Sequence, residues 1–380
     1  MPKDRSQPDA CPGALQVHQA ADGALARVRL PGGVLTPPQL QTLADAARTL
    51  GNGQLELTSR GNIQLRAVKD PNAFAEQIAS AGLLPSATHE RVRNILASPL
   101  SGRIGGVADI RNLVTQLDSA VQSDHALADL PGRTLFTLDD GRGDISGLHG
   151  DFGLHAHSET EHSLVLAGHR TSHRVHEDDA ISLLLDAAHA FLAVRDTHWR
   201  LAEVPDGIAR TIDHLGLGAE FAGAIDLSPD AGPAIGWLEQ RDGTVALGGG
   251  LQFGLLDARL AEFLAAIEKP VVVTPWRSVL IFDLDEGAAE QVVRVLAPMG
   301  LIFDENSPWL DVTACTGSPG CEKSLADVRS DAITAVEQEK LPIEGRQHWA
   351  GCDRSCGRPR GDVADVIATG DGYRVNPTVR

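Results

Sequence analysis

The sequence lacks several features, and each absence excludes a class of protein. Its longest apolar runs, such as the one that begins at Ala180, are far too short to span a membrane. The N-terminal stretch MPKDRSQPDACPG contains no apolar signal segment, which predicts a cytoplasmic protein. Positive charge is also scarce, because 33 Lys and Arg residues stand against 51 Asp and Glu residues, a net charge of −18. Such a chain does not offer the basic face that nucleic-acid phosphates require.

What remains is the composition of an ordinary globular protein of 380 residues, with 42% hydrophobic and 22% charged residues. Lysine is rare, so arginine supplies nearly all of the positive charge. A GC-rich genome accounts for most of this bias, but it does not explain where the arginines lie. They gather in or beside the motif segments between residues 60 and 142. Because a guanidinium pairs with a carboxylate through two hydrogen bonds, this placement predicts a ligand with several carboxylates.

Four of the five cysteines form two pairs, Cys315-x5-Cys321 and Cys352-x3-Cys356, each in a turn rich in glycine. Short turns let thiolates converge on one metal centre while backbone N–H groups face the sulfurs. The spacing favours a [4Fe–4S] cluster over structural zinc, which more often uses Cys-x2-Cys, and over disulfides, which need an oxidising compartment. Cys11 stands alone and is expected to be a free surface thiol.

The chain repeats itself at an offset of about 216 residues. The collinear matches are LTSRGNIQL at 57–65 with VTPWRSVLI at 273–281, DIR at 109–111 with DVR at 327–329, and GDI at 143–145 with GDV at 361–363. Only the second copy carries the cysteine pairs, so one half would bind a cluster while the other keeps the same shape. A duplicated chain of this kind can form a pseudo-two-fold cleft for one ligand.

Each half begins with the pattern of a β-α-β-α unit. Thr36 with Pro37, and Asp70 with Pro71, provide an N-cap followed by proline, which predicts helices up to about Leu50 and Gly82. A further helix is expected at 178–194. The second half predicts helices at about 257–268 and 286–299, on either side of a strand region at 271–282.

The motif order LTSRGNIQLR, then Arg93-Asn94, then the two cysteine pairs resembles the sulfite/nitrite reductase superfamily over roughly residues 22–376. Within it, TACTGSPGCEKSLADVRSDA, LDDGRGDISGL and VTPWRSVLIFD are most similar to the precorrin-3B synthase family. The resemblance implies an α+β, internally duplicated fold with ferredoxin-like half-domains. The implied segments are a flexible tail (1–20), a half-domain (21–88), a cluster-type domain without cysteines (89–176), a helical connection (177–235), a second half-domain (236–304) and a [4Fe–4S] domain (305–380).

The resemblance also implies an activity, the O2-dependent conversion of precorrin-3A to precorrin-3B by hydroxylation and γ-lactone formation in cobalamin biosynthesis. It places the cluster ligands at Cys315, Cys321, Cys352 and Cys356. It places substrate contacts at Arg60, Asn62, Gln64, Arg66, Arg93, Asn94 and Arg133, and it assigns no catalytic residue. Arg133 falls on the first of two lysine positions of the reductases, whereas the second holds Leu135, a departure from the reductase pattern.

The alternative is a sirohaem-dependent assimilatory nitrite or sulfite reductase, in which Cys356 would bridge the cluster to the sirohaem iron. A third hypothesis is that the protein is a non-catalytic tetrapyrrole carrier. The expected partners of the synthase are precorrin-3A, O2 and an electron donor, either an NADH-linked reductase or ferredoxin. The duplicated chain is expected to be a monomer. The synthase family is also associated with a non-haem iron. His149 and the histidines between His155 and His176 are candidates, but their pattern fits a solvated strand surface, so no ligand is assigned.

Overall fold

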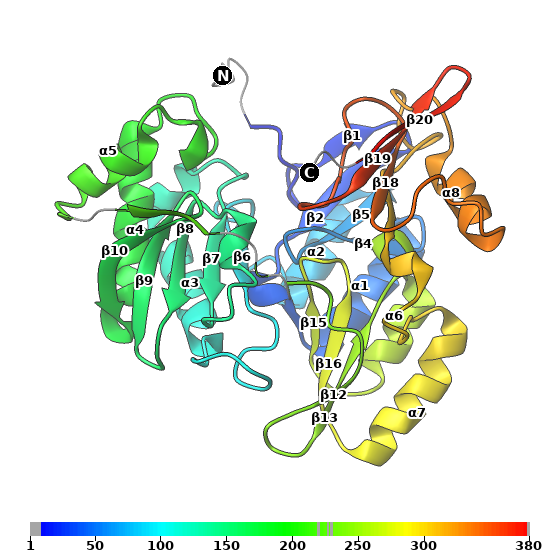
Figure 1. Ribbon diagram of the computed structural model, residues 1–380, viewed down its shortest axis with the longest axis horizontal. Coiled ribbons are helices and arrows are strands. Elements are labelled where there is room, and N and C mark those ends of the chain that lie inside the picture. The colour runs from blue at the N-terminus through cyan, green and yellow to red at the C-terminus, as the bar shows by residue number, and fades with distance from the viewer. Residues whose placement is uncertain (1–8, 219–220, 226–227, 229–230, 378–380) are drawn as a thin grey trace.

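The computed structural model describes residues 9–218, 221–225, 228 and 231–377. These residues form two lobes. The lobe at the left of Figure 1 contains one six-stranded sheet, and the other lobe contains three further sheets. The mixture of helices and sheets confirms the predicted α+β class. No helix in the described part of the chain is long and apolar enough to cross a membrane.

Two five-stranded sheets form the base of the larger lobe, and each includes a strand from the other half of the chain. The first sheet has the order β1-β2-β5-β4-β14, formed by His18–Ala20, Gly23–Val28, Ile63–Val68, Gln54–Leu57 and Leu255–Asp257. The second has the order β12-β13-β16-β15-β3, formed by Gly236–Glu239, Val245–Gly249, Val279–Leu284, Val271–Val273 and Val34–Leu35. The exchanged strands β14 and β3 pair antiparallel with β4 and β15. One hydrophobic core therefore joins both half-domains, with Leu43 and Leu264 fully buried in it.

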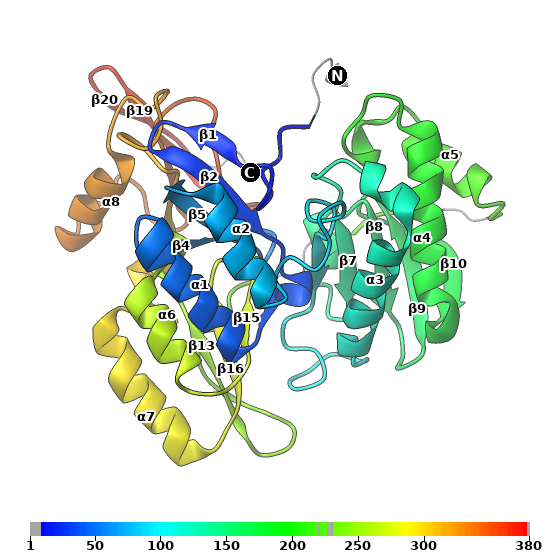
Figure 2. The ribbon, with the colours of Figure 1, turned by 180° about the vertical axis from the view of Figure 1, so that it is seen from behind.

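Four helices lie on one face of these two sheets (Figure 2). They are α1 (Pro37–Leu50), α2 (Pro71–Ser80), α6 (Ala258–Ala265) and α7 (Glu286–Leu296). The start of α1 is a complete capping box, in which Thr36 and Gln39 each accept the other's backbone N–H. Asp70 caps α2 by accepting from the backbone N–H groups of Asn72 and Ala73. Both helix starts that the sequence predicts are confirmed.

The remaining two sheets share one connectivity. The six-stranded sheet has the order β11-β10-β9-β8-β7-β6, formed by Phe221–Ala224, His169–His176, Glu161–Leu166, Phe152–Ala156, Phe136–Asp139 and Ile95–Ala97. The four-stranded sheet has the order β17-β18-β19-β20, formed by Val312–Ala314, Gln347–Ala350, Ala364–Thr369 and Gly372–Asn376. In each, three parallel strands are followed by an antiparallel one. The predicted duplication is therefore visible in the strand pairing.

The segment 177–235, expected as a connection between the halves, is largely part of the left-hand lobe. Helix α4 (Glu177–Val194) packs on β8, β9, β10 and α3 (Arg111–Ser123), and β11 extends the same sheet. The reason is the apolar face of α4, which buries Leu184 and Phe191 in the core of that lobe. The other helices are α5 (Gly207–His214) and α8 (Val328–Glu337). Short 3-10 turns lie at Pro31–Gly33, His125–Asp129, Ser146–Leu148, Leu201–Glu203, Gln252–Gly254, Ala297–Met299 and Pro308–Leu310.

Residues 9–20, expected in a flexible tail, are bound to the fold. The buried carboxylate of Glu90 accepts hydrogen bonds from the backbone N–H groups of Ala14, Leu15 and Gln16, at 2.6, 3.0 and 3.2 Å. Cys11, expected on the surface, is only 8% exposed. Its sulfur accepts hydrogen bonds from Arg27 and Arg29, so two guanidinium groups account for its burial. The sequence pattern shows neither contact.

Candidate functional site

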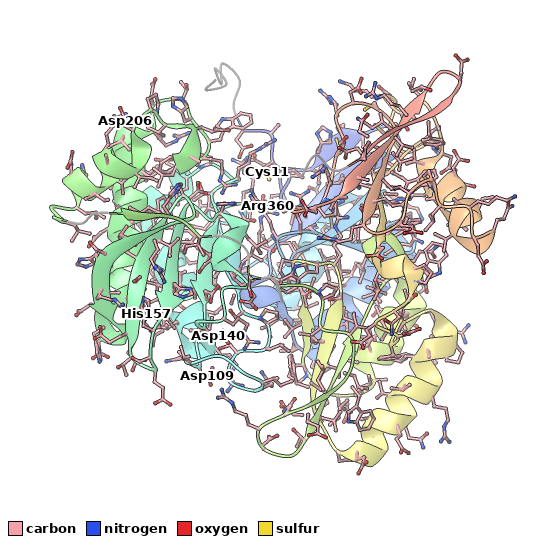
Figure 3. The ribbon with its side chains drawn as sticks, in the orientation of Figure 1. Cys11, Asp109, Asp140, His157, Asp206 and Arg360 are labelled. Carbon is pink, nitrogen blue, oxygen red and sulfur yellow. The ribbon has the colours of Figure 1, made fainter. Side chains whose placement is uncertain are left out.

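A cavity with an empty volume of about 1090 Å³ lies between the two lobes, beside the four-stranded sheet of the larger lobe. Its apolar wall includes Leu96, Leu135, Leu148 and Trp276. Its charged lining, among the described residues, consists of Asp311 and six arginines, which are Arg60, Arg200, Arg277, Arg346, Arg358 and Arg360. We refer to this space as the main cavity, and Figure 3 shows its lining residue Arg360 between the two lobes.

A second cavity of about 930 Å³ adjoins the main cavity, because Ser59, Arg60 and Arg277 line both. It extends to Cys315 and Cys356, so we refer to it as the cysteine-side cavity. Its other polar lining residues are Arg27, Glu56, Thr58, Gln64, Arg66, Thr316 and Arg329. A ligand in the main cavity would therefore have a cysteine-bearing loop on one side, with guanidinium groups between.

Two turns related by the internal repeat meet at the boundary of the two cavities. Thr58 N–H donates to Asn62 O between β4 and β5, and Thr274 N–H donates to Ser278 O between β15 and β16, each at 2.9 Å. The first turn carries Arg60. The second carries Arg277 at the position equivalent to Gly61, and Arg277 keeps the left-handed backbone (φ 60°) that the glycine also has (φ 62°). The backbone of a residue other than glycine is strained in that conformation, so the guanidinium of Arg277 is a candidate for a functional contact.

The arginines differ in how their charge is balanced. Arg200, Arg329, Arg358 and Arg66 form ion pairs with Asp151, Glu56, Asp365 and Asp22 at 2.7–2.8 Å. Arg60 forms no ion pair within the described residues. Burial, and next the neighbouring guanidinium of Arg200, lower the pKa of Arg60 to about 9. Arg60 is thus a partly buried cation at the boundary of the two cavities that can bind an anionic ligand.

The four clustered cysteines lie in two loops that the sheet brings together. Cys315 directly follows β17, and Cys352 and Cys356 follow its parallel neighbour β18, so both loops leave the same edge. Gly351 N–H donates to Cys315 Sγ at 3.2 Å. Burial, followed by the neighbouring Cys315 and Cys352 and then Cys321, raises the pKa of the Cys356 thiol. All four thiols are free of disulfides. Four free thiols in short neighbouring loops, three of which influence the fourth, fit the donor set of an iron–sulfur cluster.

Two of the other predicted substrate residues reach the cysteine-side cavity. Gln64 accepts a hydrogen bond from Arg27 at 2.8 Å and donates one to Glu56 at 2.6 Å. Arg66, whose carboxylate partner is Asp22, also donates to the carbonyl of Gly320 at 2.9 Å. Arg66 therefore ties the first cysteine loop to the first half-domain as well as lining the cavity.

The remaining predicted substrate residues line neither cavity. Arg93 is 5% exposed and forms a bidentate ion pair with Asp118 on α3, at 2.6 and 2.7 Å. Asn62 donates to Asn94 across the lobe boundary, and Asn94 donates to three backbone carbonyls, so this pair holds the lobes together. Arg133 is half exposed and stacks over Trp199. Leu135, in contrast, lines the main cavity.

Five arginines of the main cavity were not selected from the sequence. Arg277 could have been found from the repeat, because it stands 216 residues after Gly61 in a matching segment. Arg358 and Arg360 directly follow the second cysteine pair, which is a further signal. Arg200 and Arg346 carry no such signal, since each reaches the cavity only through the tertiary fold.

Histidines and carboxylates offer other candidate ligands. His348 on β18 is fully buried, its Nδ1 lies 2.9 Å from the Thr313 hydroxyl, and burial lowers its pKa to about 4. The histidines of β8–β10 lie on strands as predicted, although His162 is buried rather than solvated. Among the described residues, Asp139, Asp140 and Asp144 offer three ligand oxygens within 4.8 Å of one another. Their oxygens are already engaged by arginine, serine and backbone donors.

Comparison with known proteins shows similarity to the nitrite/sulfite reductase proteins, in fold and in sequence. Residues 18–75 match the family model described as the nitrite/sulfite reductase ferredoxin-like half domain. The solved structure of the NirA protein of Mycobacterium tuberculosis superposes with a TM-score of 0.71 at 18% identity, over 93% of this chain and 74% of that chain. The sulfite/nitrite reductase-like fold that the resemblance implied is confirmed.

Among individual relatives, the chain is 27% identical to the precorrin-3B synthase of Sinorhizobium sp, over 96% of this chain and 81% of that protein. It is 26% identical to the ferredoxin–nitrite reductase of Synechococcus elongatus, over 90% of this chain and 75% of the relative. It is 24% identical to the sulfite reductase hemoprotein β-component of Acidithiobacillus ferrooxidans, over 88% and 72%. The predicted resemblance to precorrin-3B synthase and to this superfamily is therefore confirmed.

Proposed function

We propose that the protein is a precorrin-3B synthase, an O2-dependent monooxygenase that hydroxylates precorrin-3A and closes a γ-lactone on it. The observation that carries the proposal is the main cavity, where an apolar wall and six arginines face the same space. A tetrapyrrole with acetate and propionate arms needs both, because its ring is apolar and its arms are carboxylates.

The arginines have different tasks in this proposal. Arg60, which has no ion-pair partner in the described structure, would bind a carboxylate arm at the boundary between the two cavities. Arg360 would bind another in the main cavity, where burial and the neighbouring Arg200 lower its pKa. Arg277 donates to the carbonyl of Gly357, so it also fixes the loop of Cys356 against the cavity. Fixed donors of this kind orient a macrocycle before any reaction occurs.

The four cysteines would hold a [4Fe–4S] cluster, as proposed from their loops and mutual proximity. When bound, such a cluster supplies single electrons. Cys315 and Cys356 line the cysteine-side cavity, so this chain would bring the electrons to the edge of the substrate site. The electrons would come from an external donor, either ferredoxin or an NADH-linked reductase, and the protein would act as a monomer. A non-haem iron is a further proposed cofactor with no ligand assigned.

A second candidate function is a sirohaem-dependent nitrite or sulfite reductase. The observation that favours it is Cys356, which lines a cavity that adjoins the arginine-lined main cavity. The main cavity argues for the synthase, since Leu135 lines it at the position where the reductases carry their second lysine, and Arg133 stacks on Trp199 instead of lining it. Reduction of a small anion favours a dense cationic pocket, and an apolar residue at this position weakens it.

Purification under anaerobic conditions, followed by iron, sulfide and tetrapyrrole analysis, separates the two functions. The synthase predicts iron and sulfide in cluster proportions, a broad absorption shoulder, and conversion of added precorrin-3A only when O2 and a reductant are present. Extractable sirohaem with a Soret-type band, together with nitrite or sulfite reduction, would replace the synthase by the second candidate.

A further inference from the structure

A smaller chamber adjoins the main cavity. Its empty volume is about 440 Å³, and it shares Pro233 and Trp276 with the main cavity. The rest of its lining is mostly apolar, with Pro99, Leu100, Gly232, Ala234 and Leu280. Its polar lining residues, among those described, are Arg142, Asp144 and Thr274. Since a water molecule occupies about 30 Å³ and needs at least two polar partners, the chamber can hold a short water chain near these three side chains.

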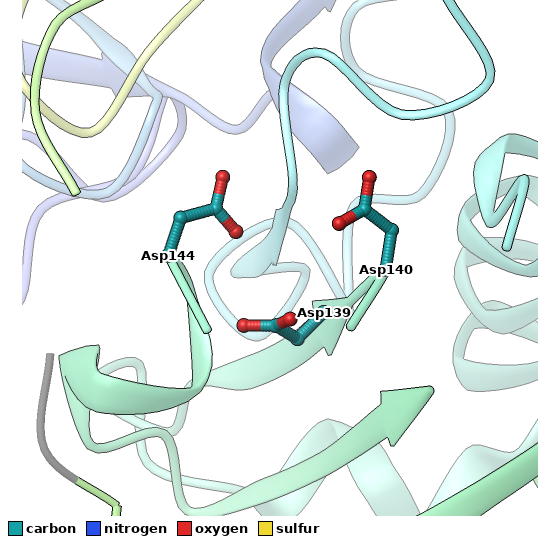
Figure 4. Close-up of side chains that lie close together, drawn as sticks. All are labelled: Asp139, Asp140 and Asp144. Atoms are coloured by element: carbon teal, nitrogen blue, oxygen red, sulfur yellow. The ribbon is translucent and has the colours of Figure 1, made fainter. Parts of the chain in front are cut away.

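Asp144 is the carboxyl group that faces this chamber. Its neighbours Asp139 and Asp140 lie close to it and point toward it, but they do not line the chamber (Figure 4). Asp140 is bound by Arg142 through two hydrogen bonds, at 2.6 and 2.8 Å. Asp139 accepts four backbone N–H groups, from residues 141, 143, 145 and 146, at 2.8–2.9 Å. Both of these carboxylates are therefore engaged by dedicated donors.

The environment of Asp144 is different. It is 6% exposed, it accepts one hydrogen bond from the Ser98 hydroxyl at 2.6 Å, and Arg142 Nε lies 3.8 Å away. Among the described residues, the other charged groups that face it are Asp139 and Asp140, and the described second half-domain contributes the uncharged Thr274, Trp276 and Leu280. Burial, and next the negative charge of Asp139, raise the pKa of Asp144 to about 7. The carboxyl group can thus gain and lose a proton near neutral pH.

We propose that Asp144 is the proton-exchanging carboxyl of this protein and that it delivers protons to the main cavity through the chamber it lines. The proposal rests on the proposed function. Transferring one oxygen atom of O2 to the substrate and reducing the other to water consumes two electrons and two protons. The electrons come from the external donor. Asp144 gives its proton to the oxygen that leaves as water, through water in the chamber, and the resulting carboxylate is reprotonated from solvent.

A titration of the protein without substrate tests the exchange step by itself. Infrared difference spectra between pH 5 and 9 should contain a carboxylic C=O band with a midpoint near the pKa of about 7. The band should be absent in Asp144→Asn and present in Asp109→Asn, a control whose exposed carboxylate pairs with Arg111 outside the cavities. Ser98→Ala removes a hydrogen bond that stabilises the charged form, so it should move the midpoint to higher pH. A band that persists in Asp144→Asn overturns the assignment.

The pH dependence of turnover tests delivery. The wild-type rate should fall as pH rises through about 7, Ser98→Ala should move this limb to higher pH, and Asp144→Asn should lose the limb with about 100-fold of the rate. If precorrin-3A is not converted, the same pH profiles can be measured for nitrite reduction, which also consumes protons. Failure to convert precorrin-3A would refute the proposed function but not proton delivery by Asp144. A wild-type pH profile in folded Asp144→Asn overturns delivery. If Asp144→Asn does not fold, the direction of the Ser98→Ala shift decides the question.

Discussion

Replacing Arg60 with alanine should weaken ligand binding without weakening the fold. In the described structure Arg60 has no anionic partner, burial lowers its pKa, and it lies at the boundary of the two cavities. No carboxylate is left uncompensated when it is removed, so the free energy of unfolding should change by about 1 kcal/mol or less. A bound carboxylate would lose a charged hydrogen bond of about 1.5–3 kcal/mol. The dissociation constant for a polycarboxylate tetrapyrrole should therefore rise about 10- to 150-fold.

Arg93→Ala is the matched control, because the same change is made to a buried arginine outside both cavities. Arg93 and Asp118 form a bidentate ion pair, and their side chains are 6% and 18% exposed. Breaking a buried pair leaves a charge without its partner, which costs about 3 kcal/mol at the lower end of the usual range. This variant should unfold at lower temperature and, while folded, bind the ligand with wild-type affinity.

Fluorescence titration with uroporphyrin III or precorrin-3A measures the binding, and chemical denaturation measures the stability. The two variants should show opposite patterns, weak binding with a stable fold for Arg60→Ala and normal binding with a weak fold for Arg93→Ala. Equal affinity of Arg60→Ala and wild type would remove Arg60 from the binding site. Reduced affinity of folded Arg93→Ala would show that the site extends beyond the two cavities.

Three further predictions concern other parts of the molecule. Cys356→Ser should abolish the visible absorption of the purified protein together with its activity, and activity that survives without the absorption would make the cluster purely structural. Arg277→Gly removes the strain of a left-handed backbone, about 1 kcal/mol, but also removes the hydrogen bond to the Gly357 carbonyl. The free energy of unfolding measured by denaturation should therefore be nearly unchanged, while ligand affinity should fall about tenfold. A wild-type affinity would exclude a role for this side chain in binding. A hydrogen bond from Arg103 is the main reason that the pKa of Asp283 is lowered to about 2. This pair therefore stabilises the fold at neutral pH, and the stabilisation is lost as pH falls from about 4, the ordinary pKa of Asp, to about 2. Arg103→Ala should accordingly lower the free energy of unfolding by about 0.5–1 kcal/mol at pH 7, and denaturation curves that differ equally at pH 7 and pH 2 would contradict this cause.

The repeat made most of the fold predictable from the sequence. Matching segments with a nearly constant offset predicted two copies of one unit, and the paired turns around Arg60 and Arg277 are its structural counterpart. The strand exchange was beyond sequence reasoning, because β3 and β14 have two and three residues and no pattern that specifies a partner. The same holds for residues 9–17, which depend on the distant carboxylate of Glu90.

The site was predictable only in part, since a motif shows which residues are neighbours in sequence but not which charges are balanced in space. Arg60 and Arg93 look equivalent in their segments, yet only Arg93 meets a carboxylate, Asp118, which lies 25 residues away on α3. Arg200 and Arg346 face the cavity from loops that carry no motif. The number of hydrogen-bond donors likewise separates Asp144 from its two neighbours, although all three are buried and lie within the segment LDDGRGD.

The proposed function requires that the arginine-lined main cavity accepts precorrin-3A and that oxygen from O2 is inserted into this substrate. The most direct measurement is a mass spectrum of the product after anaerobically purified protein is given precorrin-3A, a reductant and ¹⁸O-labelled O2. We expect a product that carries one labelled oxygen atom and that is absent when Cys356→Ser replaces the wild type. Recovery of unaltered precorrin-3A from a protein that contains sirohaem and reduces nitrite or sulfite would contradict it.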